Sequence, residues 1–560
     1  YTFLRNLEHR LQYVEDAQTH TVPSGEAERA VIAAMMGMPD AATLLKELDG
    51  HRQFVAAQFD RIFSDKSADK DKDEAAASAD FDADNSKALE ARLATLGFDD
   101  APAASARLLA TLQSPRLQAM QDASRQRLEA LVHNALPLIA ADTRAGGAGQ
   151  LATLGRLLDF LEAIARRSAY LSLLTEYPPT LERVVSMMSA SGWAATFLTR
   201  HPILLDELLD ERMRTALPDM AALALELRAQ LDGADGDTER QMDLLREAHH
   251  AQLFHWLAQD LAGDLTVEKL ADHLSQLADV IVAATVQAAW RTLPKRHQET
   301  PNFAVIAYGK LGGKELGYVS DLDVVFLYND DNPEAPALYA KLAQRFITWM
   351  TAHTSAGILF DVDIALRPDG ASGMLVSSVQ SFERYQNSSA WVWEHQALTR
   401  ARFCAGDAAI GARFEQIREQ VLRRERADDG ELKREVPAMR QKMREAHKAR
   451  PPLFDLKQDA GGMIDIEFMV QYLVLQHAAR YPQLTANSGN IALLRLCGEL
   501  GLIDAELAAL VGDAYRALRK LQHRMRLQGQ DLARVEPAEV EPHAGHVRRL
   551  WQAIFGQNVA

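Results

Sequence analysis

The sequence predicts a mostly α-helical protein with a small α+β unit set into it and a helical bundle after that unit. Two observations support this class. Apolar residues recur at helical spacing through much of the chain before residue 295 and again after residue 412. Between these regions, short apolar runs alternate with turns that contain glycine or aspartate, which is typical of strands. We therefore expect one small mixed sheet within residues 296–412.

The composition is that of a globular protein. The chain has 560 residues, which predicts about three or four domains. Its net charge of −16 argues against a nucleic-acid polymer as partner, because proteins that bind such polymers usually carry a basic surface. Cys404 and Cys497 lie far apart without a metal-site spacing and are predicted to be reduced thiols. Since neither a membrane-spanning run nor a signal peptide is visible, we expect a cytoplasmic protein without a membrane partner.

Two short segments of the chain are similar to each other. Tyr1–Arg10 and Tyr515–Arg524 share Tyr, Leu-Arg, Leu and His-Arg in the same register, and an amphipathic segment that ends in glycine follows each. We interpret residues 1–40 as the tail of an upstream copy of the same module, and the chain as a fragment of a tandem protein. A chance similarity between two helices is the alternative.

The region before the α+β unit is predicted to be helical in two parts. Residues 41–145 are expected to form a helical linker or regulatory region. Within it, residues 64–87 are rich in Asp, Lys, Ala and Ser and have few large apolar side chains, so we expect disorder there. Residues 146–295 carry two apolar stripes at helical spacing. The first stripe is Leu154, Leu157, Leu158, Leu161 and Ile164, and the second is Leu204, Leu205, Leu208 and Leu209.

The main functional motif is a strand, a loop and a second strand. The apolar runs Phe303–Tyr308 and Val324–Tyr328 are the predicted strands, and the loop between them holds glycines that would let backbone N–H groups approach a phosphate closely. Asp321 and Asp323 open the second strand and point the same way, because side chains alternate along a strand. Two carboxylates on one face repel unless a cation lies between them, so the pair predicts a Mg²⁺ site. The alternative is a tight β-hairpin with solvated aspartates.

A third carboxylate strengthens the metal interpretation. Leu359–Pro368 is strand-like and would place Asp361, Asp363 and Arg367 on one face. Pro336–Thr351 has helical spacing, so a strand, a helix and a strand would bring Asp363 beside the aspartate pair. Three carboxylates that hold two metal ions beside a phosphate loop suit phosphoryl or nucleotidyl transfer.

Two later segments fit more than one role. One helix face combines Trp391, Glu394, His395 and Leu398. This face would either pack against its neighbours or close over a nucleotide. Residues 413–560 are predicted to form a C-terminal helical domain. In that domain Asp465 would favour the positive end of a helix dipole, and Lys457 would reach a phosphate in the cleft if its role is functional.

The chain resembles a known family at these motifs. A glycine-containing loop, Asp-x-Asp and a later Asp on a neighbouring strand are similar to the polymerase-β-type nucleotidyltransferase superfamily. A longer set of sequence motifs resembles the glutamine synthetase adenylyltransferase family over nearly the whole chain. These motifs are YGKLGGKELGY at 308–318, SDLD at 320–323, VD and LRP within 362–368, SGMLV at 372–376, WEHQAL at 393–398, FDLK at 454–457, DAGG at 459–462 and DIEF at 465–468.

The resemblance implies a fold and an activity. The family carries two related catalytic halves, one that adenylylates glutamine synthetase and one that removes the AMP, and the wording at 372–376 and 393–396 is similar to the adenylylating half. We therefore expect a polymerase-β-like catalytic domain at 296–412. The implied reaction is Mg²⁺-dependent transfer of AMP from ATP to a tyrosine hydroxyl of glutamine synthetase, with release of pyrophosphate, in the regulation of nitrogen assimilation. The PII signal-transduction protein and glutamine are the implied regulators.

These arguments give one set of predicted site residues. The predicted catalytic residues and metal ligands are Asp321, Asp323 and Asp363. The predicted phosphate contacts are Gly309, Lys310, Gly312, Gly313 and Ser320, with Arg367 nearby.

Three alternative functions stay open. The first is phosphorolytic removal of AMP from the same tyrosine on the same fold. The second is a non-catalytic module that binds a nucleotide or a regulator, against which the complete carboxylate trio argues. The third is nucleotidyl transfer to RNA or a small molecule, against which the acidic net charge and the long helical flanks argue.

Overall fold

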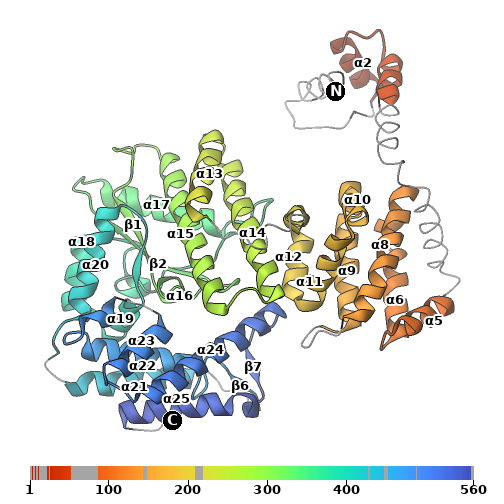
Figure 1. Cartoon of the computed structure of the whole chain (residues 1–560). Coiled ribbons are helices and arrows are strands. Elements are labelled where there is room, and N and C mark those ends of the chain that lie inside the picture. Colours follow the sequence, from red (N-terminus) through yellow and green to blue (C-terminus); the bar gives the residue numbers. More distant parts are fainter. Residues whose placement is uncertain are drawn as a thin grey trace.

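A computed structural model of the chain describes residues 3, 7, 11, 22–23, 25–51, 86–142, 148–208, 219–426, 429–446, 452–486 and 489–556. Most of the predicted disordered segment 64–87 and most of Tyr1–Arg10 lie outside these residues. The described part is mostly helical and has a small mixed sheet near its middle, which confirms the predicted class (Figure 1). None of its helices combines the length and the apolar character that crossing a membrane requires.

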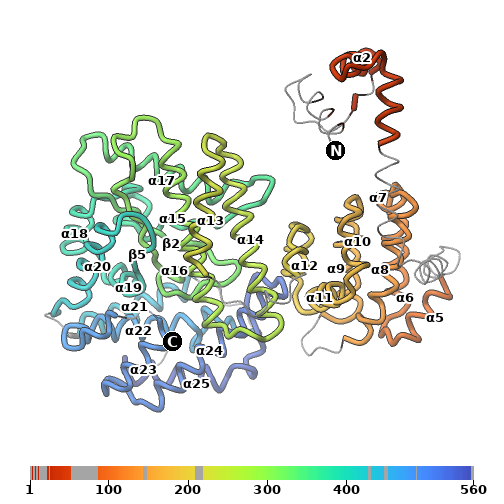
Figure 2. Tube along the Cα trace, turned by 45° about the horizontal axis from the view of Figure 1, so that its top comes forward, coloured from red at the N-terminus to blue at the C-terminus, as the bar shows by residue number. Residues whose placement is uncertain are grey.

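Helices make up the described chain before the sheet. Their bounds are α2 (Glu26–Met35), α5 (Ser86–Leu96), α6 (Ala101–Leu112), α7 (Pro115–Gln118), α8 (Asp122–Ala141), α9 (Gln150–Ile164), α10 (Ser168–Glu176), α11 (Pro178–Ala190), α12 (Gly192–Arg200), the 3₁₀ helix η2 (Pro202–Leu208), α13 (Met220–Gly233), α14 (Thr238–Ala262) and α15 (Val267–Arg291). Figure 2 shows α2 apart from α5–α12, and α2 contributes to a small apolar cluster of its own.

Helices α5–α12 share one apolar core. This core contains residues from Leu89 in α5 to Leu208 in η2, together with Phe254 and Leu257 of α14 and Leu527, so it spans the predicted boundary between residues 145 and 146. The first predicted stripe lies on α9 and is buried in this core. The second stripe forms the 3₁₀ helix η2 instead of an α-helix, and its last member, Leu209, lies outside the described residues.

The sheet has five strands of mixed direction. Its strands are β1 (Phe303–Ala307), β2 (Leu322–Tyr328), β3 (Val362–Asp363), β4 (Val376–Ser378) and β5 (Arg402–Gly406). Strand β1 lies between β2 and β5 and is antiparallel to both. Strand β2 pairs in parallel with β3 near its start and with β4 near its end. Helix α17 (Ala335–Thr351) connects β2 to β3, which confirms the helix predicted from the spacing in Pro336–Thr351.

Each face of the central strands belongs to a different core. Phe326 of β2 lies in the core formed with α13–α15 and α17. Val325 and Leu327 lie in the core formed with the C-terminal helices. Because side chains alternate along a strand, Asp321 and Asp323 project on the same face as Val325 and Leu327. The two carboxylates therefore face the side of the sheet that the C-terminal helices cover.

The predicted strand at Leu359–Pro368 is wrong in length. Only Val362–Asp363 pairs with β2. The chain turns immediately afterwards, because the Ala365 N–H donates to Oδ1 of Asp363 (2.7 Å) and the Arg367 guanidinium donates to the Ile364 carbonyl (2.8 Å). Strand alternation therefore does not extend from Asp363 to Arg367.

The rest of the chain is a helical bundle with a two-stranded ribbon. Its elements are α18 (Val379–Ser388), α19 (Val392–Thr399), α20 (Ala408–Leu422), α21 (Asp429–Ala446), β6 (Phe454–Asp455), α22 (Met463–His477), η5 (Pro482–Thr485), α23 (Asn490–Glu499), α24 (Ala505–Leu527), β7 (Arg534–Val535) and α25 (Pro537–Phe555). Helix α24 also reaches the first half of the chain, because Ser191 Oγ donates to the Leu527 carbonyl (2.6 Å) and His523 bonds to Asp260 (2.7 Å).

A buried ion pair anchors α22 to α21. Asp465 lies in the first turn of α22, as predicted, and is fully buried. Its Oδ1 accepts from Arg440 Nε (2.6 Å) and from Arg444 Nη2 (3.2 Å), and its Oδ2 accepts from the Gly461 N–H (2.7 Å). These arginines, rather than the helix dipole alone, therefore compensate the buried carboxylate.

We expect Asp465→Ala to lower the free energy of unfolding by about 3–5 kcal/mol, because Arg440 would stay buried without its charged partner. The matched control is Glu499→Ala, which removes an exposed pair with Arg495 (3.5 Å) and is expected to change stability little. Chemical unfolding followed by circular dichroism measures both variants. Equal losses in the two variants would contradict the assignment of Asp465 as an anchor.

Candidate functional site

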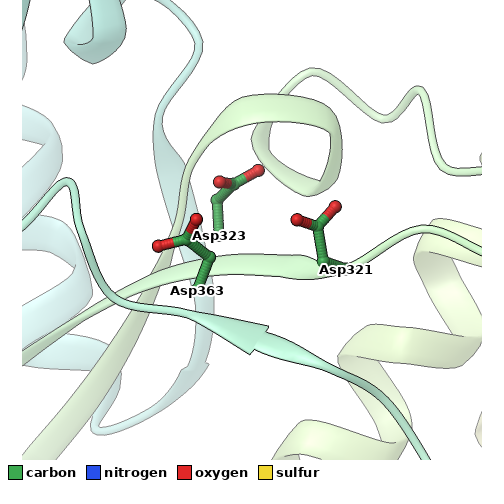
Figure 3. Close-up of side chains that lie close together, drawn as sticks. All are labelled: Asp321, Asp323 and Asp363. Carbon is green, nitrogen blue, oxygen red and sulfur yellow. The ribbon is translucent and has the colours of Figure 1, made fainter.

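Three carboxylates meet at one edge of the sheet. Asp321 directly precedes β2, Asp323 lies in β2, and Asp363 lies opposite Asp323 in the parallel register of β3. One carboxylate oxygen from each residue lies within 4.8 Å of the other two (Figure 3). The structure thus brings together the three residues predicted as metal ligands.

The electrostatics of this group favour a cation. Burial raises the pKa of Asp323 to about 6, and the negative charges of Asp321 and Asp363 contribute to the rise. The backbone N–H and the ammonium of Lys310 act in the opposite direction but do not cancel it. Three carboxylates supply hard oxygen donors, which are the ligands that Mg²⁺ prefers. The donor set therefore fits Mg²⁺, and a bound divalent cation would relieve the repulsion.

Gly309 is required by the position of Asp323. It begins the short helix α16 (Gly309–Gly312) with φ +52°, a conformation that favours glycine. A Cβ at this position would collide with Oδ2 and Cγ of Asp323. The missing side chain therefore lets the loop backbone lie directly against a predicted metal ligand.

Gly312 and Gly313 are buried against Arg400. A Cβ on Gly312 would overlap the Arg400 carbonyl oxygen, and one on Gly313 would lie 2.6 Å from Nη2 of Arg400. Close packing thus accounts for these two glycines. Their predicted contact with phosphate stays a prediction.

Lys310, Ser320 and Lys457 line one cleft, which we call the loop cleft. Its other walls are loop residues 315–319 and parts of α12, α15, α22 and α24. Burial lowers the pKa of the Lys310 ammonium, and the positive charge of Lys457 lowers it further. Ser320 Oγ accepts from the Gly317 N–H (3.0 Å) and so closes the turn before Asp321. The loop cleft therefore has Lys310 and Lys457 in its wall, together with Arg519 and Arg526 of α24.

Arg367 stabilises the loop beside Asp363. It lines an open pocket together with Asp321 and Asp363. Its guanidinium, however, donates to three carbonyls of its own loop, those of Ile364 (2.8 Å), Ala371 (3.2 Å) and Gly373 (3.3 Å). The structure therefore gives Arg367 a role in shaping the loop around η4 (Gly370–Ser372).

Glu394 and His395 are buried and bonded inside the helical layer. Glu394 accepts from the Trp391 N–H (2.8 Å) and from the Tyr385 hydroxyl (2.9 Å). His395 Nε2 lies 3.1 Å from the Gln386 carbonyl oxygen. These contacts agree with the packing interpretation for Glu394 and His395, whereas Trp391 of the same predicted face is 68% exposed.

Sequence reasoning missed a buried polar network behind the loop. Glu315 accepts from Arg400 (2.6 Å), from the Tyr515 hydroxyl (2.7 Å) and from Asn490 Nδ2 (3.2 Å). Arg400 also pairs with Glu467 (3.1 Å). Burial opposes ionisation of Glu315, but Arg400 and a second arginine hold its pKa below the ordinary value. The only local feature of the sequence that pointed to this network was the pair Gly312-Gly313. Two adjacent glycines indicate that another group packs closely there, but they do not identify it as Arg400.

Gly309→Ala is expected to destabilise the protein by about 2 kcal/mol or more, because the new Cβ meets Asp323 and the positive φ becomes strained. Gly317→Ala is the matched control in the same loop. Its Cβ would find only Ser320 Oγ at 3.7 Å, and we expect a much smaller effect. Thermal unfolding without added metal measures the stability of both variants. If Gly317→Ala lost as much stability as Gly309→Ala, the close approach of Gly309 to Asp323 would not explain the effect.

Asp323→Asn is expected to stabilise the metal-free protein near neutral pH by roughly 1–3 kcal/mol, because it removes the repelled charge. The folded pKa of about 6 exceeds the ordinary 3.8, so the wild type loses stability from this group as pH rises between these values. The gain of the variant should therefore be small near pH 4 and complete above about pH 6. Unfolding in a chelator at both pH values measures it.

The same measurement with Mg²⁺ gives the control for that prediction. Added Mg²⁺ is expected to stabilise the wild type and to stabilise the variant less, because the variant has lost a charged ligand. A gain for Asp323→Asn that does not depend on pH would contradict the origin assigned to the pKa shift.

Comparison with known proteins gives two family matches. The family model described as glutamate-ammonia ligase adenylyltransferase matches residues 181–417, which include the sheet and all three carboxylates. The family model described as GlnD PII-uridylyltransferase matches residues 1–63 and 415–533. Those two segments contain Tyr1–Arg10 and most of the C-terminal bundle, including Tyr515–Arg524.

Curated relatives are similar over the whole chain. Proteins called bifunctional glutamine synthetase adenylyltransferase/adenylyl-removing enzyme are 53% identical over 556 residues in Aromatoleum aromaticum and 52% identical over 561 residues in Ralstonia nicotianae. Each alignment covers 99% of this chain and 58% of the relative. The relative from Chromobacterium violaceum is 50% identical over 560 residues, which is all of this chain and 61% of that protein. The chain thus spans about three fifths of the relatives it matches.

Proposed function

Because this chain belongs to the family of bifunctional glutamine synthetase adenylyltransferase/adenylyl-removing enzymes, we propose that it transfers AMP from ATP to a tyrosine hydroxyl of glutamine synthetase. The reaction releases pyrophosphate and uses Mg²⁺. The observation that carries this proposal is the group of Asp321, Asp323 and Asp363 beside a glycine loop with a partly buried lysine. This arrangement suits transfer of a nucleotidyl group.

The proposed chemistry uses the residues in separate roles. Asp321, Asp323 and Asp363 would hold two Mg²⁺ ions, which when bound neutralise phosphate charge and lower the pKa of a hydroxyl. Lys310 holds its ammonium in the loop cleft, where it would bind the phosphates. The tyrosine oxygen forms a bond to the α-phosphorus, the bond from that phosphorus to the bridging oxygen breaks, and pyrophosphate leaves. The hydroxyl proton passes to solvent.

The direction of the reaction is part of the proposal. The names of the relatives include both addition and removal of AMP. The wording at 372–376 and 393–396 resembles the adenylylating half, so we propose addition. Regulation by PII protein and glutamine, a cytoplasmic location, and the division into 1–40, 41–145, 146–295, 296–412 and 413–560 belong to the same proposal.

Transfer of label from α-labelled ATP to purified glutamine synthetase tests it. With Mg²⁺, the native chain is expected to label the synthetase. Asp321→Ala combined with Asp323→Ala should lose about 100-fold or more of the rate, because the metal ligands are gone. Glu499→Ala is the folded control and should retain the rate.

Two outcomes would contradict parts of the proposal. Labelling by the double variant would mean that these carboxylates are not the catalytic site. If the native chain, given PII protein and glutamine, does not label the synthetase but releases AMP from adenylylated synthetase in phosphate, the direction is wrong.

A further inference from the structure

Two lysines from distant parts of the chain face the loop cleft. Lys310 belongs to α16 in the catalytic unit, and Lys457 follows β6 in the C-terminal bundle. Lys310 lies close enough to both Lys457 and Asp321 for their charges to change its pKa. The carboxylates, Lys310 and Lys457 therefore form one continuous electrostatic neighbourhood across the junction of the two parts.

The backbone of Lys457 is held rigidly. The Lys457 N–H donates to Oδ1 of Asp455 (3.1 Å), and the Ile464 N–H donates to the Lys457 carbonyl (3.2 Å). Gly461 and Gly462 allow this tight turn, because a Cβ on either would meet backbone oxygens at 2.9 Å or less. The side chain itself is exposed and lines the cleft. A fixed backbone that carries an exposed ammonium suits recruitment of an anion.

The two carboxylates that line the loop cleft are already paired. They are Glu315 and Glu467, and both pair with Arg400 (2.6 Å and 3.1 Å). Arg519 and Arg526 of α24 also line the cleft and add to its positive charge. Among the residues that the structure describes, neither Lys310 nor Lys457 has a carboxylate oxygen within 4.0 Å of its ammonium. The positive charges of Lys310 and Lys457 repel each other, and a multiply charged anion between them would remove that cost.

The sheet geometry places the carboxylates and Lys457 on the same side. Asp321 and Asp323 project on the face that the C-terminal helices cover, and Lys457 comes from that same side. An anion that bridges Lys310 and Lys457 would therefore lie on the side of the sheet to which the carboxylates project.

We propose that Lys457 binds the β- and γ-phosphates of the nucleotide together with Lys310, so that the polyphosphate links the catalytic unit to the C-terminal bundle. The identity of the nucleotide rests on the proposed function, whereas the two-lysine site rests on the cleft itself. A lysine in a solvated turn without a ligand is the competing explanation.

Binding measurements on the whole chain test this site. The probes are inorganic tripolyphosphate, ATP and AMP, each titrated calorimetrically with Mg²⁺ present. Lys457→Gln is expected to lower the affinity for tripolyphosphate and for ATP by about tenfold or more. The affinity for AMP should change less than about twofold. Lys457→Arg should retain most of the affinity, and Lys433→Gln, on the exposed side of α21, is the matched control.

A double variant separates direct binding from a structural effect. If one polyphosphate contacts both lysines, the losses from Lys310→Gln and Lys457→Gln should not add in the combined variant. The proposal would be overturned if Lys457→Gln lowered the affinities for AMP and tripolyphosphate equally. It would also be overturned if the affinity for tripolyphosphate did not change.

The outcome is separable from that of the proposed function. Tripolyphosphate binding that depends on Lys457, in a chain that labels no glutamine synthetase, would support this site and contradict the proposed activity. If the chain labels glutamine synthetase but Lys457→Gln binds tripolyphosphate as tightly as the native chain, the proposed activity is supported and this site is contradicted.

Discussion

The buried pair between Arg400 and Glu315 holds the functional loop in place. Both side chains are almost fully buried, at 7% and 10% exposed, and their charges are satisfied chiefly by each other. Tyr515 and Glu467 complete the network from α24 and α22. The carbonyl and guanidinium of the same arginine also pack on Gly312 and Gly313. One residue after α19 therefore fixes both the path of the loop and its attachment to the C-terminal bundle.

Such a network costs free energy to bury but specifies one arrangement. Removing water from several ions is expensive, and the cost is offset only when every partner is in position. Without α22, Arg400 would lose Glu467, and without α24, Glu315 would lose the Tyr515 hydroxyl, so the network is complete only when the loop and both helices assemble. That coupling places the loop cleft at the junction, where Lys310 from one side and Lys457 from the other face the same space.

The sequence predicted those parts of the site that follow from local periodicity. Strand alternation and a strand–helix–strand connection were enough to bring Asp321, Asp323 and Asp363 together. The Glu315–Tyr515 contact joins residues 200 positions apart, and no local pattern identifies such a pair. Arg367 was placed on a strand face because the spacing could not reveal that its guanidinium bonds to its own loop.

The two cores that cover the sheet come from different parts of the chain. Phe326 packs with helices that precede or follow β2 closely, whereas Val325 packs with the C-terminal bundle. Residues 296–412 on their own would lack α13–α15 from one of these cores and α21–α25 from the other. A shorter fragment cut to contain the sheet would therefore need helices from both sides to bury its apolar faces as they are buried here.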